Sequence, residues 1–159
     1  MERLWSPWRS KYVTHAEEAE GCFLCIHAAA DDDAANHVLY RAPRTFVVLN
    51  AYPYNSGHLM VAPLRHAGDL AELEAEELHE LMDETRHAVR ALEEGLGPDG
   101  FNVGMNLGRV AGAGLPGHLH VHVVPRWGGD TNFMPVVGET KVMPELLAET
   151  YEKLRPLFD

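Results

Sequence analysis

The spacing of hydrophobic residues changes along the chain, and the change predicts its secondary structure. Between residues 69 and 96, leucine, methionine and valine recur at intervals of three and four, with acidic and basic residues between them. This spacing predicts an amphipathic helix that ends near "GLGPDG" (95–100), and a separate short turn before it fits the same pattern. A second helix is expected from about Met143 to Phe158, with Pro144 in its first turn.

Short apolar runs bounded by turn residues predict β-strands in the rest of the chain. "VLYR" and "TFVVLN" are separated only by "APR" and are expected to form a hairpin. The other expected strands are "HLMVAP", "GFNVGMN" and "GHLHVHVVPRW", at residues 58–63, 100–106 and 117–127. Five strands in hairpin-like order, with one long helix and a C-terminal helix, indicate an α+β protein with a mostly antiparallel sheet.

Composition narrows the classes of protein to consider. A length of 159 residues suits a single domain, expected over 1–159 with residues 1–20 as an N-terminal arm. No apolar run reaches the length of a membrane span, and the N-terminus lacks the apolar centre of a secretory signal. A formal net charge of −11 argues against nucleic acid as a partner. We therefore expect a cytoplasmic protein with neither a membrane nor a nucleic acid as its partner.

The only two cysteines, Cys22 and Cys25, are three positions apart in "CFLC". In a chain without an export signal, this spacing is typical of metal binding or redox chemistry rather than of a structural disulfide. The spacing alone leaves these two uses open.

Three histidines, His118, His120 and His122, occupy alternate positions in the last predicted strand. Side chains alternate between the faces of a strand, so all three imidazoles are expected on one face and the intervening apolar residues on the other. The outer two would then lie about 13 Å apart, too far to share one metal ion unless the strand bends sharply. At least one of these histidines must therefore serve another purpose.

A glycine-rich segment, "NLGRVAGAG" (106–114), leads into the histidines. Glycines let backbone N–H groups approach a ligand closely, and such loops form anion-binding concavities. An anion cradle beside a neutral imidazole is a suitable arrangement for attack on phosphorus, because an unprotonated ring nitrogen is a nucleophile near neutral pH.

The segment "HLHVHVV" resembles the signature of the histidine triad (HIT) superfamily of nucleotide hydrolases and transferases. The resemblance extends to "LWSPWRSKYV", "CFLC", "LNAYPYNSGHLMVAP", "NLGRVAGAG" and "VVPRWGGDTNFMPVVGETKV". The N-terminal arm and the Trp127 segment are similar to the bacterial branch that resembles diadenosine tetraphosphate phosphorylases. This resemblance implies a HIT-like fold whose sheet continues across a dimer, or a tetramer assembled through the arm and the Trp127 segment.

The resemblance also implies catalytic roles. The family's nucleophile matches His120, which would attack the α-phosphorus of a nucleotide and form a nucleotidyl-histidine intermediate. Water or phosphate would then release the nucleotide. His122 matches the histidine that lies against the phosphate, His118 an orienting or structural position, and His58 a further member of the same hydrogen-bonded array.

Nucleotide-binding positions follow from the same match. Asn50 corresponds to a ribose-side position and Asn106 to a phosphate contact, and the matching tryptophan, Trp127, approaches the site of a neighbouring subunit. The glycine-rich segment contributes Gly112, Ala113 and Gly114. Many dinucleotide hydrolases of the family carry glutamine where this chain has Gly114, so the smaller residue modestly favours phosphorolysis over hydrolysis.

Some relatives bind a structural zinc ion with residues that match Cys22, Cys25, His66 and His118. The resemblance implies that this zinc ion is structural and that the chemical step requires no cofactor. The leading expectation is an enzyme that cleaves dinucleoside polyphosphates, with a homodimer or tetramer as the assembled form. The alternatives are a nucleotide-binding regulator with little turnover and a purine-nucleoside phosphoramidase. The choice between phosphorylase and hydrolase, the second base and the phosphate-chain length stay open.

Overall fold

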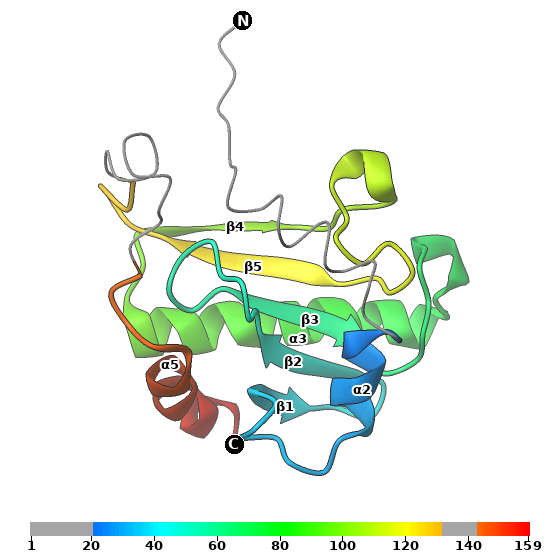
Figure 1. The fold of residues 1–159 in the computed structure, drawn as a ribbon, viewed down its shortest axis with the longest axis horizontal. Coiled ribbons are helices and arrows are strands. Elements are labelled where there is room, and N and C mark those ends of the chain that lie inside the picture. Colours follow the sequence, from blue (N-terminus) through cyan, green and yellow to red (C-terminus); the bar gives the residue numbers. More distant parts are fainter. Residues whose placement is uncertain (1–20, 132–142) are drawn as a thin grey trace, which may run out of the picture.

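A five-stranded antiparallel sheet forms the centre of the computed structural model, which describes residues 21–131 and 143–159 (Figure 1). Its strand order is β1-β2-β3-β5-β4. The strands are β1 (Val38–Arg41), β2 (Thr45–Leu49), β3 (Leu59–Pro63), β4 (Gly100–Gly104) and β5 (Val121–Arg126). The predicted α+β class and the hairpin of β1 and β2 are confirmed. The predicted arm, residues 1–20, lies outside the described residues.

One face of the sheet is covered by the long helix α3 (Ala75–Leu96), as the periodicity predicts. Its buried side chains, including Leu81 and Leu92, form the main core with residues of β2, β3 and β5. A short 3₁₀ helix, η1 (Leu70–Glu72), precedes it and is the separate turn expected there. The helix ends where Gly97 adopts a left-handed conformation (φ 56°), which glycine adopts without strain. Within the described residues, no helix combines the length and apolar content of a membrane span.

The second predicted helix begins later than expected. The helix α5 (Leu147–Leu154) continues into the 3₁₀ helix η3 (Arg155–Phe158), and both pack against α3. The expected start at Met143, with Pro144 in the first turn, is wrong. The carboxylate of Glu149 accepts a hydrogen bond from the Leu146 N–H (3.1 Å), which caps the helix at that point.

Among the described residues, the helix α2 (Phe23–Ala29) covers the other face of the sheet over β1, β2 and β3. Leu24 of α2 is fully buried against this part of the sheet. Arg41 of β1 donates hydrogen bonds to three carbonyl oxygens at the end of α2, those of His27, Ala28 and Ala30. The "CFLC" segment is therefore the start of a helix held against β1, rather than a simple turn.

The histidine segment is not one continuous strand, which corrects the sequence interpretation. Pairing with β3 begins at Val121, so His118 and His120 precede β5. The Leu119 N–H donates instead to the carbonyl oxygen of Ala67 (2.7 Å), in the loop after β3. This hydrogen bond draws the chain away from the ladder, and the first histidine is free to face a different direction from the third.

The start of α3 is fixed by an ion pair that supports a stability prediction. Arg65 donates to both carboxylate oxygens of buried Glu77 (3.0 and 2.6 Å), and this pairing holds the pKa of Glu77 at about 2, below its ordinary 4.5. A lowered folded-state pKa adds stability above the unfolded-state value, and the contribution is lost as the pH falls through the folded-state value. Because Arg65 is 48% exposed, solvent screens this ion pair, and we expect it to contribute about 1–2 kcal/mol to the free energy of unfolding.

Glu77→Gln is therefore expected to lower the free energy of unfolding by about 1–2 kcal/mol at pH 7. The difference from the wild type should shrink between pH 4.5 and 2. Urea unfolding at several pH values measures it, with the exposed neighbour Glu76→Gln as the matched control. A difference that is the same at both ends of this pH range would contradict the assigned ion pair.

Candidate functional site

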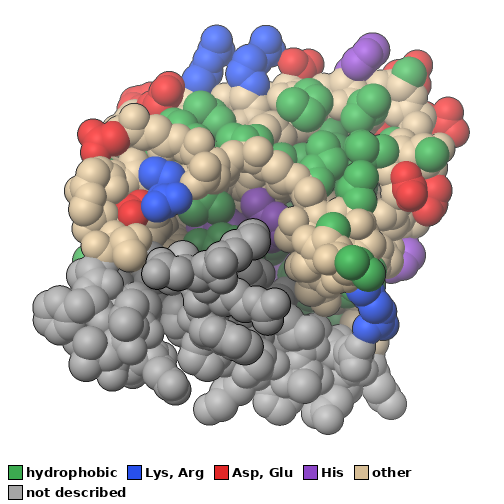
Figure 2. Space-filling view, turned by 90° about the horizontal axis from the view of Figure 1, so that it is seen from above, with side chains coloured by type: hydrophobic (Ala, Val, Ile, Leu, Met, Phe, Trp, Pro, Cys, Tyr) green, Lys and Arg blue, Asp and Glu red, His purple; other side chains and the backbone are tan. Residues whose placement is uncertain are grey.

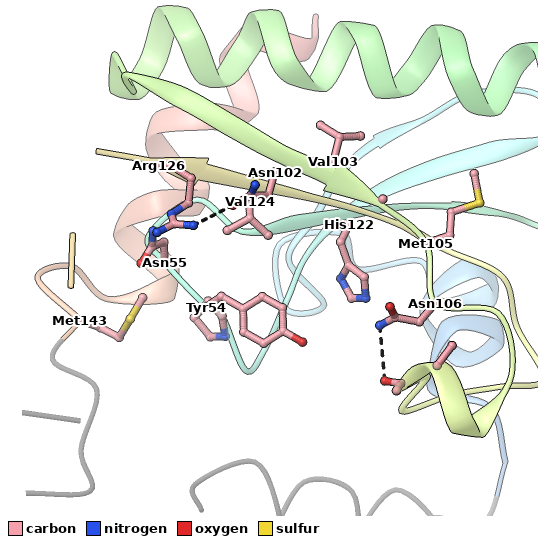
Figure 3. A pocket seen from close by; sticks show the side chains of 14 residues that line it. Tyr54, Asn55, Asn102, Val103, Met105, Asn106, His122, Val124, Arg126 and Met143 are labelled. Carbon is pink, nitrogen blue, oxygen red and sulfur yellow. Dashed lines mark hydrogen bonds between the residues drawn. The ribbon is translucent and has the colours of Figure 1, made fainter. Parts of the chain in front are cut away.

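A cavity of about 650 Å³ lies above β4 and β5, on the face of the sheet opposite α3. Figure 2 shows a hollow in this face with histidine side chains at its base. Lining residues come from the loop before β3, from both strands and from the glycine-rich segment: Pro53, Tyr54, Asn55, Asn102, Val103, Gly104, Met105, Asn106, Ala111, Gly112, His122, Val124, Arg126 and Met143. His122 projects into the middle of this cavity (Figure 3).

A chain of hydrogen bonds sets the proton positions on two histidines. The backbone N–H of Tyr54 donates to Nδ1 of His58 (3.0 Å), so a neutral His58 carries its proton on Nε2. That Nε2 lies 3.0 Å from Nδ1 of His122 and donates to it. His122 therefore carries its own proton on Nε2, as a hydrogen-bond donor. The Tyr54 ring stacks on His58 and keeps it in this orientation (centroids 4.6 Å apart).

His120 has the opposite tautomer. Its Nδ1 lies 2.8 Å from the carbonyl oxygen of His118, which can only accept, so Nδ1 carries the proton and Nε2 has a free lone pair. Burial lowers the pKa of His120, which favours the neutral ring. The rings of His120 and His122 meet edge to face, 4.7 Å between centroids. A nucleophilic nitrogen and a donor nitrogen thus come from adjacent imidazoles.

The expected nucleotide-binding residues are only partly brought together. Asn106 and Gly112 line the cavity, and the Asn106 amide donates to the Gly112 carbonyl oxygen (3.4 Å), which closes the glycine-rich segment on itself. Asn50 is buried behind the cavity, where its amide nitrogen lies 3.4 Å from Nε2 of His58. Ala113, Gly114 and Trp127 are not among the described residues that line the cavity.

Several lining residues were missed by sequence reasoning, above all Tyr54, Asn102 and Arg126. Tyr54 orients His58 through its backbone, and no side-chain pattern reports such a bond. The alternation that singled out the histidines continues to Arg126, which lies on the same face of β5 as His122. This continuation is the sequence signal that could have identified Arg126 as a lining residue.

A second cluster lies where α2 meets the bend before β5. The side chains of Cys22, Cys25, His66 and His118 place one ligand atom each within 4.8 Å of one another. The Cys22 Sγ lies 3.1 Å from Nδ1 of His118, and the Cys25 Sγ lies 3.3 Å from Nδ1 of His66. Nε2 of His118 donates to the Pro63 carbonyl oxygen (2.8 Å), so Nδ1 is unprotonated and faces the sulfurs. These four residues can hold one metal ion.

The bend thus separates the three histidines between two centres. The side chain of His118 belongs to the Cys and His cluster, whereas His122 lines the cavity and the ring of His120 lies against that of His122. The prediction that the three histidines do not share one metal site is consistent with this geometry. The bend before β5 separates them, rather than the length of a flat strand.

The comparisons with known proteins agree with this fold. The chain belongs to the histidine triad family: the family model described as "HIT domain" matches residues 32–129. The chain is 43% identical over 159 aligned residues to a protein named AP-4-A phosphorylase from Mycobacterium tuberculosis, covering 94% of this chain and 80% of that protein.

Two further relatives are more distant. A bis(5'-nucleosyl)-tetraphosphatase (asymmetrical) of Schizosaccharomyces pombe is 32% identical over 91 residues, which cover 57% of this chain and half of that protein (50%). The crystal structure of a Zn-bound histidine triad family protein from Mycobacterium smegmatis superposes with a TM-score of 0.71 at 27% identity, covering 86% of this chain and 92% of that one. The HIT fold expected from the sequence is confirmed.

Proposed function

We propose that the protein cleaves dinucleoside polyphosphates of the diadenosine tetraphosphate type at the α-phosphorus, through a nucleotidyl-His120 intermediate. The observation that carries the proposal is the pairing of an unprotonated His120 Nε2 with a donor Nε2 on His122 beside one cavity. The names of the M. tuberculosis and S. pombe relatives support the same class of substrate.

The reaction takes two displacements at phosphorus. The lone pair of His120 Nε2 attacks the α-phosphorus, a P–N bond forms, and the P–O bond to the second nucleotide breaks, with the electron pair leaving on that oxygen. The Nε2–H of His122 donates to the transferring phosphate and offsets its growing negative charge. The ring of His120 becomes positive in the intermediate, and the carbonyl oxygen of His118 stabilises it through Nδ1–H.

The second displacement reverses these bonds. An oxygen of inorganic phosphate, or of water, attacks the same phosphorus, and the electrons of the P–N bond return to His120. Phosphate gives a nucleoside diphosphate and water gives a nucleoside monophosphate. We favour phosphate as the acceptor, because Gly114 adds no side chain at the position where glutamine occurs in many hydrolases, and because the 43% identical relative is named a phosphorylase.

The first test identifies the products. With diadenosine tetraphosphate and phosphate, chromatography is expected to show ADP and ATP, and very little turnover without phosphate. His120→Ala should reduce turnover by about a thousandfold or more while binding of the nucleotide persists, because a nucleophile contributes mainly to the covalent step. His79→Ala, at an exposed position of α3, is the matched control.

AMP and ATP formed without phosphate would identify a hydrolase instead. A His120→Ala variant that keeps a tenth of the wild-type rate would exclude His120 as the nucleophile. Wild-type protein that binds the dinucleotide but never cleaves it would favour a nucleotide-binding regulator.

We also propose that Cys22, Cys25, His66 and His118 hold a structural zinc ion. Two thiolates and two imidazoles are a common tetrahedral zinc set, and the proton of His118 already lies on the nitrogen that faces away from the sulfurs. The Zn-bound M. smegmatis relative supports this choice of metal. Thiolate ligands persist in a reducing compartment, which agrees with the proposed cytoplasmic location.

Protein purified without added metal is expected to contain about one zinc ion per chain by elemental analysis, and Cys25→Ser should lose most of it. Chelation should lower the melting temperature more than it lowers the rate of the chemical step, because the ion lies outside the cavity. Less than a tenth of an ion per chain, with both cysteines readily alkylated, would contradict the proposal.

The proposed assembly is at least a homodimer in which the sheet continues across a two-fold axis. The strand β4 is an edge of the sheet, and an unpaired edge is open to pairing with another chain. Three large apolar side chains are exposed on β4 and α3: Val103, Leu78 and Met82. We expect these side chains to be buried in the interface with the second copy.

Light scattering at micromolar concentration is expected to give the mass of a dimer or a tetramer. Met82→Glu should shift the population toward smaller species, because it places a charge in the expected interface. Ile26→Glu, an equally exposed apolar residue on α2, is the control. A wild-type monomer would contradict the proposed assembly.

A further inference from the structure

The cavity extends well beyond the histidines, toward the end of β5. Its lining runs from Asn106 and Gly112 past His122 to Val124 and Arg126 (Figure 3). His122 and Arg126 lie on the same face of β5 and four residues apart, so the cavity reaches about 13 Å along the strand from the donor histidine. This length is more than one phosphate group can fill.

The direction of this extension matches the path of a leaving group. His120 lies on the bend that precedes β5, and Arg126 is the last residue of that strand, so the cavity beyond His122 extends away from the proposed nucleophile. In an in-line displacement the leaving group departs from the side opposite the attacking atom. We therefore expect the part of the cavity that leads to Arg126 to receive the leaving group.

The far end offers hydrogen-bond donors. Nη1 of Arg126 donates to Oδ1 of Asn102 (2.7 Å), which orients the Asn102 amide and leaves both hydrogens of its Nδ2 for another acceptor. Arg126 uses one N–H in that bond and two in bonds to Asp130 (2.6 and 3.0 Å). Two of its five N–H groups have no acceptor among the described residues.

The same end carries no net charge. Asp130 pairs with Arg126 through both carboxylate oxygens, and this guanidinium holds the pKa of Asp130 well below its usual range. Asn55 also donates to Asp130 (2.6 Å) and to the Pro125 carbonyl oxygen, which fixes the turn after β5. A rigid, uncharged and donor-rich end suits a neutral group with acceptor atoms better than it suits another phosphate.

The space before that end is suited to a flat group. Val124 forms an apolar floor, and Gly104 of β4 adds no side chain, with nothing within 4 Å of where a Cβ would stand. The ring of Tyr54 projects into the cavity from the facing loop (Figure 3). An aromatic ring opposite an apolar floor provides stacking contacts for a nucleobase.

We propose that the part of the cavity that runs from Tyr54 and Val124 to Asn102 and Arg126 at its far end binds the distal nucleoside of the leaving nucleotide. Asn102 and Arg126 donate hydrogen bonds to acceptor atoms of its base or ribose, and Val124 and Tyr54 contact its flat surface. This assignment rests on the proposed cleavage of dinucleoside polyphosphates and makes Asn102 a residue that distinguishes substrates by their leaving group.

The test compares two substrates that deliver the same AMP group to His120. Diadenosine tetraphosphate carries a distal nucleoside, whereas adenosine 5'-phosphorofluoridate releases only fluoride. Asn102→Ala is expected to lower kcat/KM about tenfold for the dinucleotide, and to change it less than about twofold for the phosphorofluoridate. Asn102→Asp keeps the size of the side chain but replaces its donors by an acceptor, so a larger loss is expected for the dinucleotide alone.

Binding provides a readout that needs no turnover. In the His120→Ala background, Asn102→Ala should raise the Kd for diadenosine tetraphosphate about tenfold and leave the Kd for AMP unchanged, as measured by calorimetry. His79→Ala is again the control, because this exposed residue lies on the helix across the sheet from the cavity.

Equal losses for both substrates, or no loss for either, would overturn the assignment of the far end while the proposed function stands. Wild-type protein that cleaves neither substrate would overturn the proposed function and, with it, this inference. If Asn102→Ala lowers the melting temperature, the same rates and dissociation constants are measured on the isosteric Asn102→Asp variant, and the assignment stands or falls on those values.

Discussion

The hydrogen bond from Nδ1 of His120 to the carbonyl oxygen of His118 is the contact on which the rest of the site depends. It fixes the tautomer of His120, so the lone pair of Nε2 is available for chemistry, and in the proposed reaction it supplies a dipole that stabilises the positive ring of the intermediate. A carbonyl oxygen can only accept, so this bond permits no other tautomer of the neutral ring. Its geometry in turn depends on the bend before β5, where the Leu119 N–H leaves the sheet to bond Ala67. One backbone hydrogen bond therefore divides the histidines between two centres.

A chain with a formal charge of −11 must bind a polyanion if the proposed function holds. The long-range field of such a chain repels its substrate, so attraction has to come from short-range donors. The described part of the cavity contains such groups: the Nε2–H of His122, held by His58 and the Tyr54 backbone, and the amide of Asn106 at the glycine-rich segment. Among the described residues that line the cavity, Arg126 alone has a full positive charge, and it is already neutralised by Asp130. Recognition by oriented dipoles rather than by net charge also favours the transition state, because dipoles that are already fixed need no reorganisation when charge develops.

Local patterns predicted the features that local sequence controls. The helix α3 followed from apolar residues at intervals of three and four, and the strands followed from short apolar runs between turn residues, because burial imposes these patterns directly. The features that were missed depend on contacts between distant residues. The bend at His118 requires a carbonyl 52 positions away from Leu119, at Ala67. The late start of α5 depends on the side chain of Glu149, and the role of Tyr54 on a backbone N–H. The resemblance to the histidine triad family named the cavity histidines and the Cys and His cluster, but not the residues at the far end of the cavity, which no motif marks.

The two centres share a stretch of backbone but not a side chain. In His118 the ring faces the sulfurs of α2 while the carbonyl oxygen holds the nucleophile, and the Nε2–H bond to Pro63 ties both to the end of β3. A metal ion at the cluster would therefore act on the reaction only through the position of one peptide group. Loss of the ion would loosen α2 and the bend together, whereas the ladder of β3 and β5 would still hold His122 against His58. His122 is thus fixed by the sheet, and the proposed nucleophile, His120, by the loop that contains His118 of the cluster. This difference explains how a metal centre outside the cavity can stabilise the active geometry without taking part in the bonds that form and break.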